Sequence, residues 1–184
     1  ETAMVIRSDR IVVIVGHQTE DVRRALKSYR VIFAEQKDQL GTGHAVMQAV
    51  PFFEGADDTL LVLAGDTPLL TAATLKKLVF EHHRLQAAVS ILTAKMNEPA
   101  GFGRIVRTKE GQIIRIVEEK DATDEEREIK EINTSTYCFH TPLLMEALKK
   151  IKPMNMQGEY YLTDTIGILR DQGHRIEGII ATDP

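Results

Sequence analysis

TLLVLAGDTPLL (residues 59–70) is the stretch that decides the fold. Its apolar run, LLVLA (60–64), predicts a strand buried on both faces, as in a parallel sheet. The run ends at Gly65 and Asp66. In open parallel sheets, ligands bind beyond the carboxyl ends of the strands. Asp66 therefore stands where a ligand site is expected.

Asp66 has two interpretations. As a hard oxygen ligand it suits Mg²⁺ bound to phosphates, because Mg²⁺ prefers one or two carboxylates together with phosphate and water oxygens. Gly65 beside it would let a ligand come close. Alternatively, Gly-Asp-Thr-Pro is good turn chemistry, and Asp66 caps the helix that follows. The residues alone leave both interpretations open.

The segments around this strand alternate between strand and helix. Further strands are predicted at 11–15, 31–36 and 87–96, and helices at 19–29, at 71–86 and between Gly43 and Pro51. This alternation predicts an α/β fold with a mainly parallel, doubly wound sheet and helices on both faces.

After residue 96 the pattern becomes β-rich, which predicts a small insertion around 97–135. RIVRT and IIRIVEE flank KEGQ and predict a hairpin with glycine at the turn, and the polar DATDEEREIK predicts a short helix or a solvated loop. The remaining expected elements are a strand at 131–140, a helix capped by Thr141 with Pro142 at its first position, a helix ending at Gly173, and a last strand, RIEGII.

Composition restricts the class of protein. The 184 residues, with 43% hydrophobic and 27% charged side chains, suit one soluble globular domain. A net charge of −4 argues against nucleic-acid binding through bulk electrostatics. The single cysteine, Cys138, cannot form an internal disulfide and fits a reducing compartment. No apolar run is long enough to span a bilayer and no signal peptide opens the chain, so we expect a cytoplasmic protein without a nucleic-acid or membrane partner.

QKDQLGTGHAV (36–46) is a second candidate site. Gly41 and Gly43 permit positive φ and expose main-chain N–H groups just before a helix N-terminus. Thr42 adds a hydroxyl, and Gln36 offers a carboxamide that can both donate to and accept from a base such as uracil. The alternative is a flexible connection between a strand and a helix.

Polar residues also stand at strand ends in the second half. Gly103 would let main chain approach a sugar, and Arg104 would pair with a phosphate, pair with a neighbouring acid, or lie on the surface. Glu118 would accept from sugar hydroxyls or belong to a solvated strand end. Asn133 lies in a predicted strand, where asparagine is disfavoured, which indicates a ligand or a bulge.

Several classes of site lack their signature. The six histidines do not have zinc-ligand spacing, and the glycines match neither a dinucleotide fingerprint nor a P-loop. No Gly-x-Ser-x-Gly elbow occurs, and Cys138 lies in an apolar strand typical of the core.

Six segments, taken in order, are more specific than any one alone. QLGTGHAV, LAGDTPLL, GFGRIVR, IVEEKDAT, EINTSTYCF and QGEYYLTD resemble the uridylyltransferase domain of the bacterial bifunctional N-acetylglucosamine-1-phosphate uridylyltransferase/glucosamine-1-phosphate acetyltransferase family. The resemblance runs from IVVIVGH to RIEGII, essentially the whole chain.

The resemblance implies a Rossmann-like nucleotide-diphospho-sugar transferase fold and a Mg²⁺-dependent reaction. UTP and N-acetylglucosamine 1-phosphate would give UDP-N-acetylglucosamine and pyrophosphate. It also implies a cytoplasmic enzyme of peptidoglycan and lipopolysaccharide precursor synthesis, which is a homotrimer when complete.

The implied residue roles divide between nucleotide and sugar. Gln36, Gly41 and Thr42 would hold uracil and ribose, Ala64 and Gly65 would line the nucleotide by main chain, Asp66 would bind the metal and act in catalysis, and Gly103, Glu118 and Asn133 would hold N-acetylglucosamine beside a wall formed by QGEYYLTD. We therefore expect a nucleotide-binding half (1–96) and a sugar-binding half (97–184) within one truncated nucleotidyltransferase domain (1–184).

The sequence departs from the family pattern at both ends. It lacks the Gly-rich, Arg-containing triphosphate loop and its lysine, the asparagine that is the second metal ligand, and the β-helix acetyltransferase domain. Ser135 replaces a usual glycine, and Ala64 replaces a bulkier residue. We therefore expect a fragment that is inactive or impaired alone, and unpaired strand edges where the family's central first strand would lie.

Two other functions stay open at this point. One is a related sugar-1-phosphate nucleotidyltransferase that uses another sugar or base. The other is a non-catalytic module that binds a nucleotide sugar without turnover.

Overall fold

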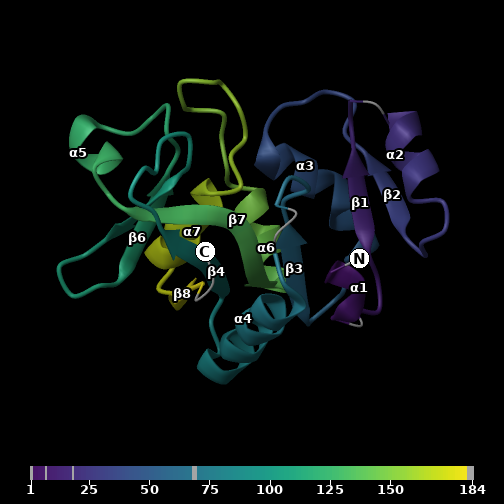
Figure 1. Ribbon diagram of the computed structural model, residues 1–184, viewed down its shortest axis with the longest axis horizontal. Coiled ribbons are helices and arrows are strands. Elements are labelled where there is room, and N and C mark those ends of the chain that lie inside the picture. The colour runs from purple at the N-terminus through teal and green to yellow at the C-terminus, as the bar shows by residue number, and fades with distance from the viewer. Residues whose placement is uncertain (1, 7, 18, 68–69, 182–184) are drawn as a thin grey trace.

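The computed structural model describes residues 2–6, 8–17, 19–67 and 70–181 (Figure 1). Its helices are α1 (Thr2–Val5), α2 (Thr19–Ala25), α3 (Thr42–Ala49), the 3₁₀ helix η1 (Val50–Phe52), α4 (Ala72–Leu85), α5 (Asp124–Arg127), α6 (Thr141–Leu148) and α7 (Asp164–Asp171). Its strands are β1 (Val12–Val15), β2 (Ile32–Glu35), β3 (Thr59–Leu63), β4 (Val89–Lys95), β5 (Arg104–Arg107), β6 (Ile113–Val117), β7 (Glu131–His140) and β8 (Ile176–Ile180).

The α/β class is confirmed, but the main sheet is mixed rather than mainly parallel. β7 pairs antiparallel with both β3 and β4, while β4 pairs parallel with β8. β3, β4 and β8 therefore run in one direction and β7 runs in the other. The chain reverses between β4 and β7, so that Lys95 at the end of β4 is the register partner of Glu131 at the start of β7. The insertion between them adds β5 and β6 to the same sheet, with β5 paired antiparallel to β7.

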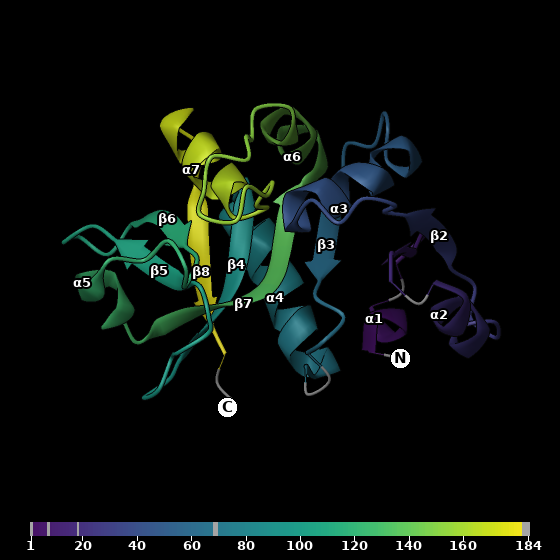
Figure 2. The same cartoon turned by 90° about the horizontal axis from the view of Figure 1, so that it is seen from above.

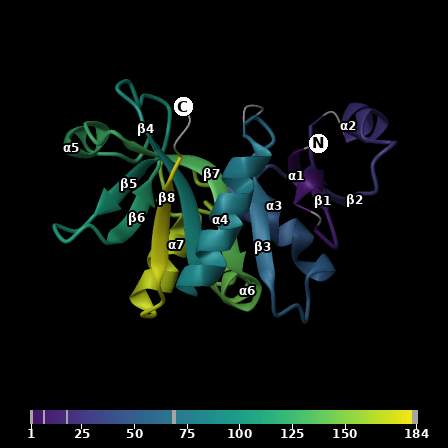
Figure 3. The ribbon, with the colours of Figure 1, turned by 60° about the horizontal axis from the view of Figure 1, so that its bottom comes forward.

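Helices cover both faces of this sheet, as the doubly wound pattern predicts. Along β7, Tyr137 and Phe139 pack into a core with α6 and α7, whereas Cys138 between them packs with Leu78 of α4. The period of two places alternate side chains on opposite faces. Figure 2 shows α6 and α7 on one side of the sheet and α4 on the other, and Figure 3 shows α4 lying along β3 and β4.

β1 and β2 form a separate parallel pair beside α3. Within the part of the chain that the structure describes, β1 pairs only with β2, and β3 pairs only with β7. Each of these two strands therefore has one edge without a strand partner, as the departure from the family pattern predicts.

The predicted hairpin forms with Gly111 at positive φ (88°), and the polar segment after it contains the short helix α5. One boundary was wrong: the N-cap of α6 is His140, and Thr141 is the first helical residue. Thr141 instead donates its hydroxyl to Asp58 (3.1 Å), which fixes the start of α6 against the loop before β3. Among the described residues, no helix combines the length and the apolar character that a membrane span requires.

Candidate active site

The turn before α3 is built around Gly41. Its φ of 105° lies in a region that L-residues rarely adopt. A Cβ atom here would stand 2.7 Å from the main-chain oxygen of Tyr160. The Gln36 side-chain amide donates to the Gly41 carbonyl (3.0 Å). Gln36 and Gly41, both predicted for the nucleotide side, are therefore in contact.

The start of α3 is tied to the QGEYYLTD segment. The Gly43 N–H donates to the Tyr160 carbonyl (2.7 Å), and the Thr42 hydroxyl accepts from the Leu162 N–H (3.0 Å). The expectation that the Gly43 N–H is exposed for a ligand was wrong, because a neighbouring loop uses it. Glycine is needed at position 43 for space, since a Cβ would lie 2.9 Å from the Tyr160 oxygen.

The three residues predicted for the sugar side lie together where β5, β6 and β7 meet. The Asn133 N–H donates to the Gly103 carbonyl (2.8 Å). A Cβ on Gly103 would lie 3.2 Å from Glu118 Oε2, so the absent side chain leaves that carboxylate accessible from this direction. Burial raises the pKa of Glu118, and the negative charges of Asp121 and Asp164 add to the rise.

Asn133 is buried and forms a bulge. Its Nδ2 donates to the Tyr137 hydroxyl (2.7 Å), and its Oδ1 accepts from the Ser135 N–H (3.1 Å). Ser135 has a φ of 56°, and the register with β4 shifts between Ile91 and Thr93. Of the two interpretations of Asn133, the bulge is confirmed, and the positive φ explains why glycine suits position 135.

The group predicted to bind the nucleotide and the group predicted to bind the sugar are joined through adjacent residues. Leu162 donates its N–H to Thr42, and Thr163 donates its hydroxyl to Glu118 (2.9 Å). Thr163 is buried, with only 3% of its surface exposed. The sequence placed it within the QGEYYLTD segment but gave no reason to name it as a site residue. One short segment therefore connects the two predicted halves of the site.

Asp66 lies at the same end of the sheet as Asn133. Leu63, the last residue of β3, pairs with Thr136, and Asp66 and Asn133 each lie three residues beyond that pair. Asp66 is exposed in the turn after β3, and Thr71 is the residue that caps α4. The alternative in which Asp66 caps this helix was therefore wrong. Pro68 and Leu69, at the end of the opening motif, lie outside the described residues.

A single exposed carboxylate fits Mg²⁺ held mainly by substrate. In the described ranges, no group of three or more histidine, cysteine, aspartate or glutamate side chains could hold a metal alone. Mg²⁺ at phosphates needs only one or two protein carboxylates. Asp66 meets that requirement, with Ala64 and Gly65 next to it and nothing within 4 Å of the position of a Gly65 Cβ.

The nucleotidyl transferase family matches residues 1–183. The chain belongs to the nucleotidyl transferase family. Among related proteins, this transferase is 49% identical over 174 residues to the bifunctional protein GlmU of Brevibacillus brevis, and 48% identical over 171 residues to that of Streptococcus gordonii. These matches cover 95% and 93% of the transferase but only 38% and 37% of the relatives, so the chain spans less than two fifths of their length.

Two solved structures share the fold of the transferase. A UDP-glucose pyrophosphorylase complexed with UDP-glucose matches with a TM-score of 0.71 at 17% identity, covering 96% of this chain and 75% of that one. A putative glucose-1-phosphate thymidylyltransferase from Bacillus anthracis matches with a TM-score of 0.71 at 21% identity, covering 94% and 68%. These likenesses confirm the fold class.

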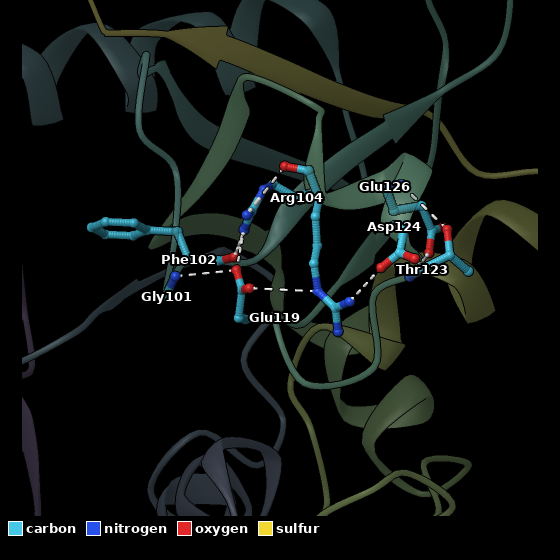
Figure 4. A network of polar contacts seen from close by, with 8 residues as sticks. Gly101, Phe102, Arg104, Glu119, Thr123, Asp124 and Glu126 are labelled. Atoms are coloured by element: carbon cyan, nitrogen blue, oxygen red, sulfur yellow. Dashed lines mark hydrogen bonds and ion pairs between the residues drawn. The ribbon is translucent and has the colours of Figure 1, made fainter.

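Arg104, the first residue of β5, lies in a network of polar contacts with Glu119 and the loop at Gly101 and Phe102 (Figure 4). Its side chain is only 2% exposed and pairs with Glu119 (2.8 Å). It also donates to the carbonyls of Phe102 and Arg127. Glu119 accepts from the Gly101 N–H (3.1 Å), and Arg104 holds the pKa of Glu119 below its usual range. Of the three interpretations of Arg104, pairing with an acid is the one observed.

Glu118 and Glu119, the two residues that follow β6, therefore have different partners. Glu119 turns to Arg104 and fixes the loop that precedes Gly103, whereas Glu118 faces Gly103 and Thr163. Sequence reasoning did not identify Glu119 or Thr163. A cavity of about 710 Å³ between β6 and the start of β8 is lined by none of the predicted site residues, so the site is not there.

Proposed function

We propose that this chain carries the uridylyltransferase site of an enzyme that transfers UMP from UTP to N-acetylglucosamine 1-phosphate. The products would be UDP-N-acetylglucosamine and pyrophosphate. The observation that carries the proposal is the continuity from Gln36 and Gly41, through Leu162 and Thr163, to Glu118. A nucleotide and a sugar bound at these two groups would therefore contact one connected set of hydrogen-bonded residues. Residues 1–96 would hold the nucleotide and residues 97–184 the sugar, in the cytoplasm.

The chemistry needs no protein nucleophile. A phosphate oxygen of the sugar phosphate forms a bond to the α-phosphorus of UTP, and the bond from that phosphorus to the bridging oxygen of pyrophosphate breaks. The residues of the chain contribute by holding both substrates in line, which removes much of the entropic cost of bringing them together. Gln36, Gly41 and Thr42 would hold uracil and ribose, and main chain at Ala64 and Gly65 would line the nucleotide.

The sugar would be held by hydrogen bonds to buried polar groups. The carboxylate of Glu118 is available to sugar hydroxyls, and Gly103 offers main chain without a covering side chain. Asn133 has a second amide hydrogen besides the one given to Tyr137. Because unpaired buried polar groups are costly, these residues would discriminate between sugars.

Asp66 would hold Mg²⁺ at the phosphates. When bound, the ion would neutralise negative charge on the phosphoryl oxygens. The contribution of Asp66 is an exposed carboxylate in the turn that follows β3.

Pyrophosphate release from UTP and N-acetylglucosamine 1-phosphate tests the proposal. It should be measured in the 184-residue chain and in the chain extended by its native upstream sequence, because the Gly-rich loop is expected there. Asp66→Ala should abolish turnover at saturating Mg²⁺ while thermal unfolding is unchanged, and Asp57→Ala, another exposed aspartate, should retain it. Retained turnover in Asp66→Ala would remove the metal assignment.

Asn133→Ala separates the two substrates. It should weaken use of the sugar phosphate more than use of UTP, whereas equal losses would remove Asn133 from the sugar site. The alternative of a non-catalytic binding module is favoured if UDP-N-acetylglucosamine binds and the extended chain shows no turnover.

A further inference from the structure

His44 contacts the predicted uracil-binding side chain directly. It is the third residue of α3, and its Nδ1 lies 3.0 Å from Nε2 of Gln36. On its other side, Nε2 of the ring lies 3.2 Å from Nε2 of Gln48. The ring of Tyr160 packs near it, with centroids 6.3 Å apart. His44 is thus held between the nucleotide side and the segment that joins the two halves of the site.

The orientation of the Gln36 carboxamide follows from its partners. The Gly41 carbonyl can only accept, so the group 3.0 Å from it must be the amide NH₂ of Gln36. The same NH₂ faces Nδ1 of His44, which completes its two hydrogens. A neutral imidazole has one acceptor nitrogen, and an amide NH₂ faces each ring nitrogen of His44, that of Gln36 at Nδ1 and that of Gln48 at Nε2. In the tautomer that carries its hydrogen on Nε2, Nδ1 accepts from Gln36.

This arrangement leaves Gln36 with only its carbonyl oxygen for a base. No donor to that oxygen is found within hydrogen-bond distance among the described residues. A carboxamide that is free to flip could present to the base either its carbonyl oxygen, which accepts, or its NH₂ group, which donates. A fixed one presents an acceptor and selects a base with an N–H at that edge. Uracil and thymine have N3–H, whereas N3 of cytosine has a lone pair.

We propose that His44 is a positioning residue for pyrimidine selection. By accepting from Gln36 it fixes the carboxamide with the oxygen toward the base, so the site takes a base with an N3–H group and rejects cytosine. The inference rests on the proposed nucleotide site and adds the determinant of base choice within it.

The test compares UDP with CDP by calorimetric titration of the 184-residue chain. UDP should bind more tightly than CDP. His44→Phe keeps a ring beside Tyr160 but removes the acceptor. It should reduce the UDP-to-CDP preference about threefold to tenfold, the range expected from one neutral hydrogen bond. His44→Asn should restore most of the preference, because its Oδ1 can accept near the position of Nδ1.

A matched control is His83→Phe, which makes the same change at an exposed histidine on α4 and should leave the preference unchanged. The side-chain NH₂ resonances of Gln36 give a readout without ligand. They should shift in His44→Phe and return toward the wild-type position in His44→Asn. An unchanged preference and unchanged Gln36 resonances in folded His44→Phe would overturn the role of His44. A wild-type chain that binds neither nucleotide would instead overturn the proposed function, and the inference with it.

Discussion

Replacing Gly41 with alanine should destabilise the chain and break the joint between the two halves of the site. The φ and ψ values of 105° and 175° belong to a region reserved for glycine, so an alanine here costs about 1–3 kcal/mol. Its Cβ would also lie 2.7 Å from the main-chain oxygen of Tyr160, which must move away. Two main-chain hydrogen bonds of Tyr160, to Leu40 and Gly43, would then weaken at about 0.5–1.5 kcal/mol each.

Together these effects predict a loss of about 2–6 kcal/mol in the free energy of unfolding. For a chain of this size that corresponds to a fall in Tm of roughly 10 °C. Urea and thermal unfolding measure both. Gly167→Ala is the matched control: it lies inside α7, no atom is within 4 Å of its added Cβ, and it should gain about 0.5–1 kcal/mol. Equal effects of the two substitutions would refute the reasoning about the Gly41 turn.

Three further changes have defined signs. Ser135→Gly should raise the free energy of unfolding by about 1 kcal/mol in urea titrations, because it relieves a φ of 56°, whereas Ser135→Ala should not. Glu118→Gln should stabilise the chain at neutral pH but weaken sugar-phosphate binding. Burial raises the folded-state pKa of Glu118, so its ionised form destabilises the fold, and unfolding curves of the two proteins should converge at acid pH, where the carboxyl is protonated. Burial lowers the pKa of His82 to about 4, so stability should fall as pH drops from about 6.5 to 4, and His82→Leu should flatten that dependence.

The strands and helices of the core follow from local patterns. The β-branched and apolar runs at β1, β3 and β4, and the helical spacing of Leu75 and Leu78 in α4, are signals that lie within one element. The direction of β7 cannot be predicted from a signal within that strand. It depends on the chain turning back after β4 so that Lys95 pairs with Glu131, two residues that are 36 positions apart.

The site residues also divide into those that local sequence patterns indicate and those that only the fold shows. Glycines and isolated polar residues at strand ends drew attention to Gly41, Gly103, Glu118 and Asn133, and Gly103, Glu118 and Asn133 do meet in space. The partner of Arg104 could not be predicted from its sequence neighbours, because Glu119 lies in the turn after β6. A buried arginine also cannot be distinguished from an exposed one by sequence alone. Only the fold shows that the loop at Tyr160–Thr163 connects the two groups.

Titration of UDP-N-acetylglucosamine into isotope-labelled chain, followed by amide resonances, tests the central claim most directly. We predict that the resonances of Gln36 to Gly43 and those of Gly103, Glu118 and Asn133 shift together with a single dissociation constant, because one ligand spans both groups. Shifts confined to one group, or found only around the cavity between β6 and β8, would contradict a shared nucleotide-sugar site.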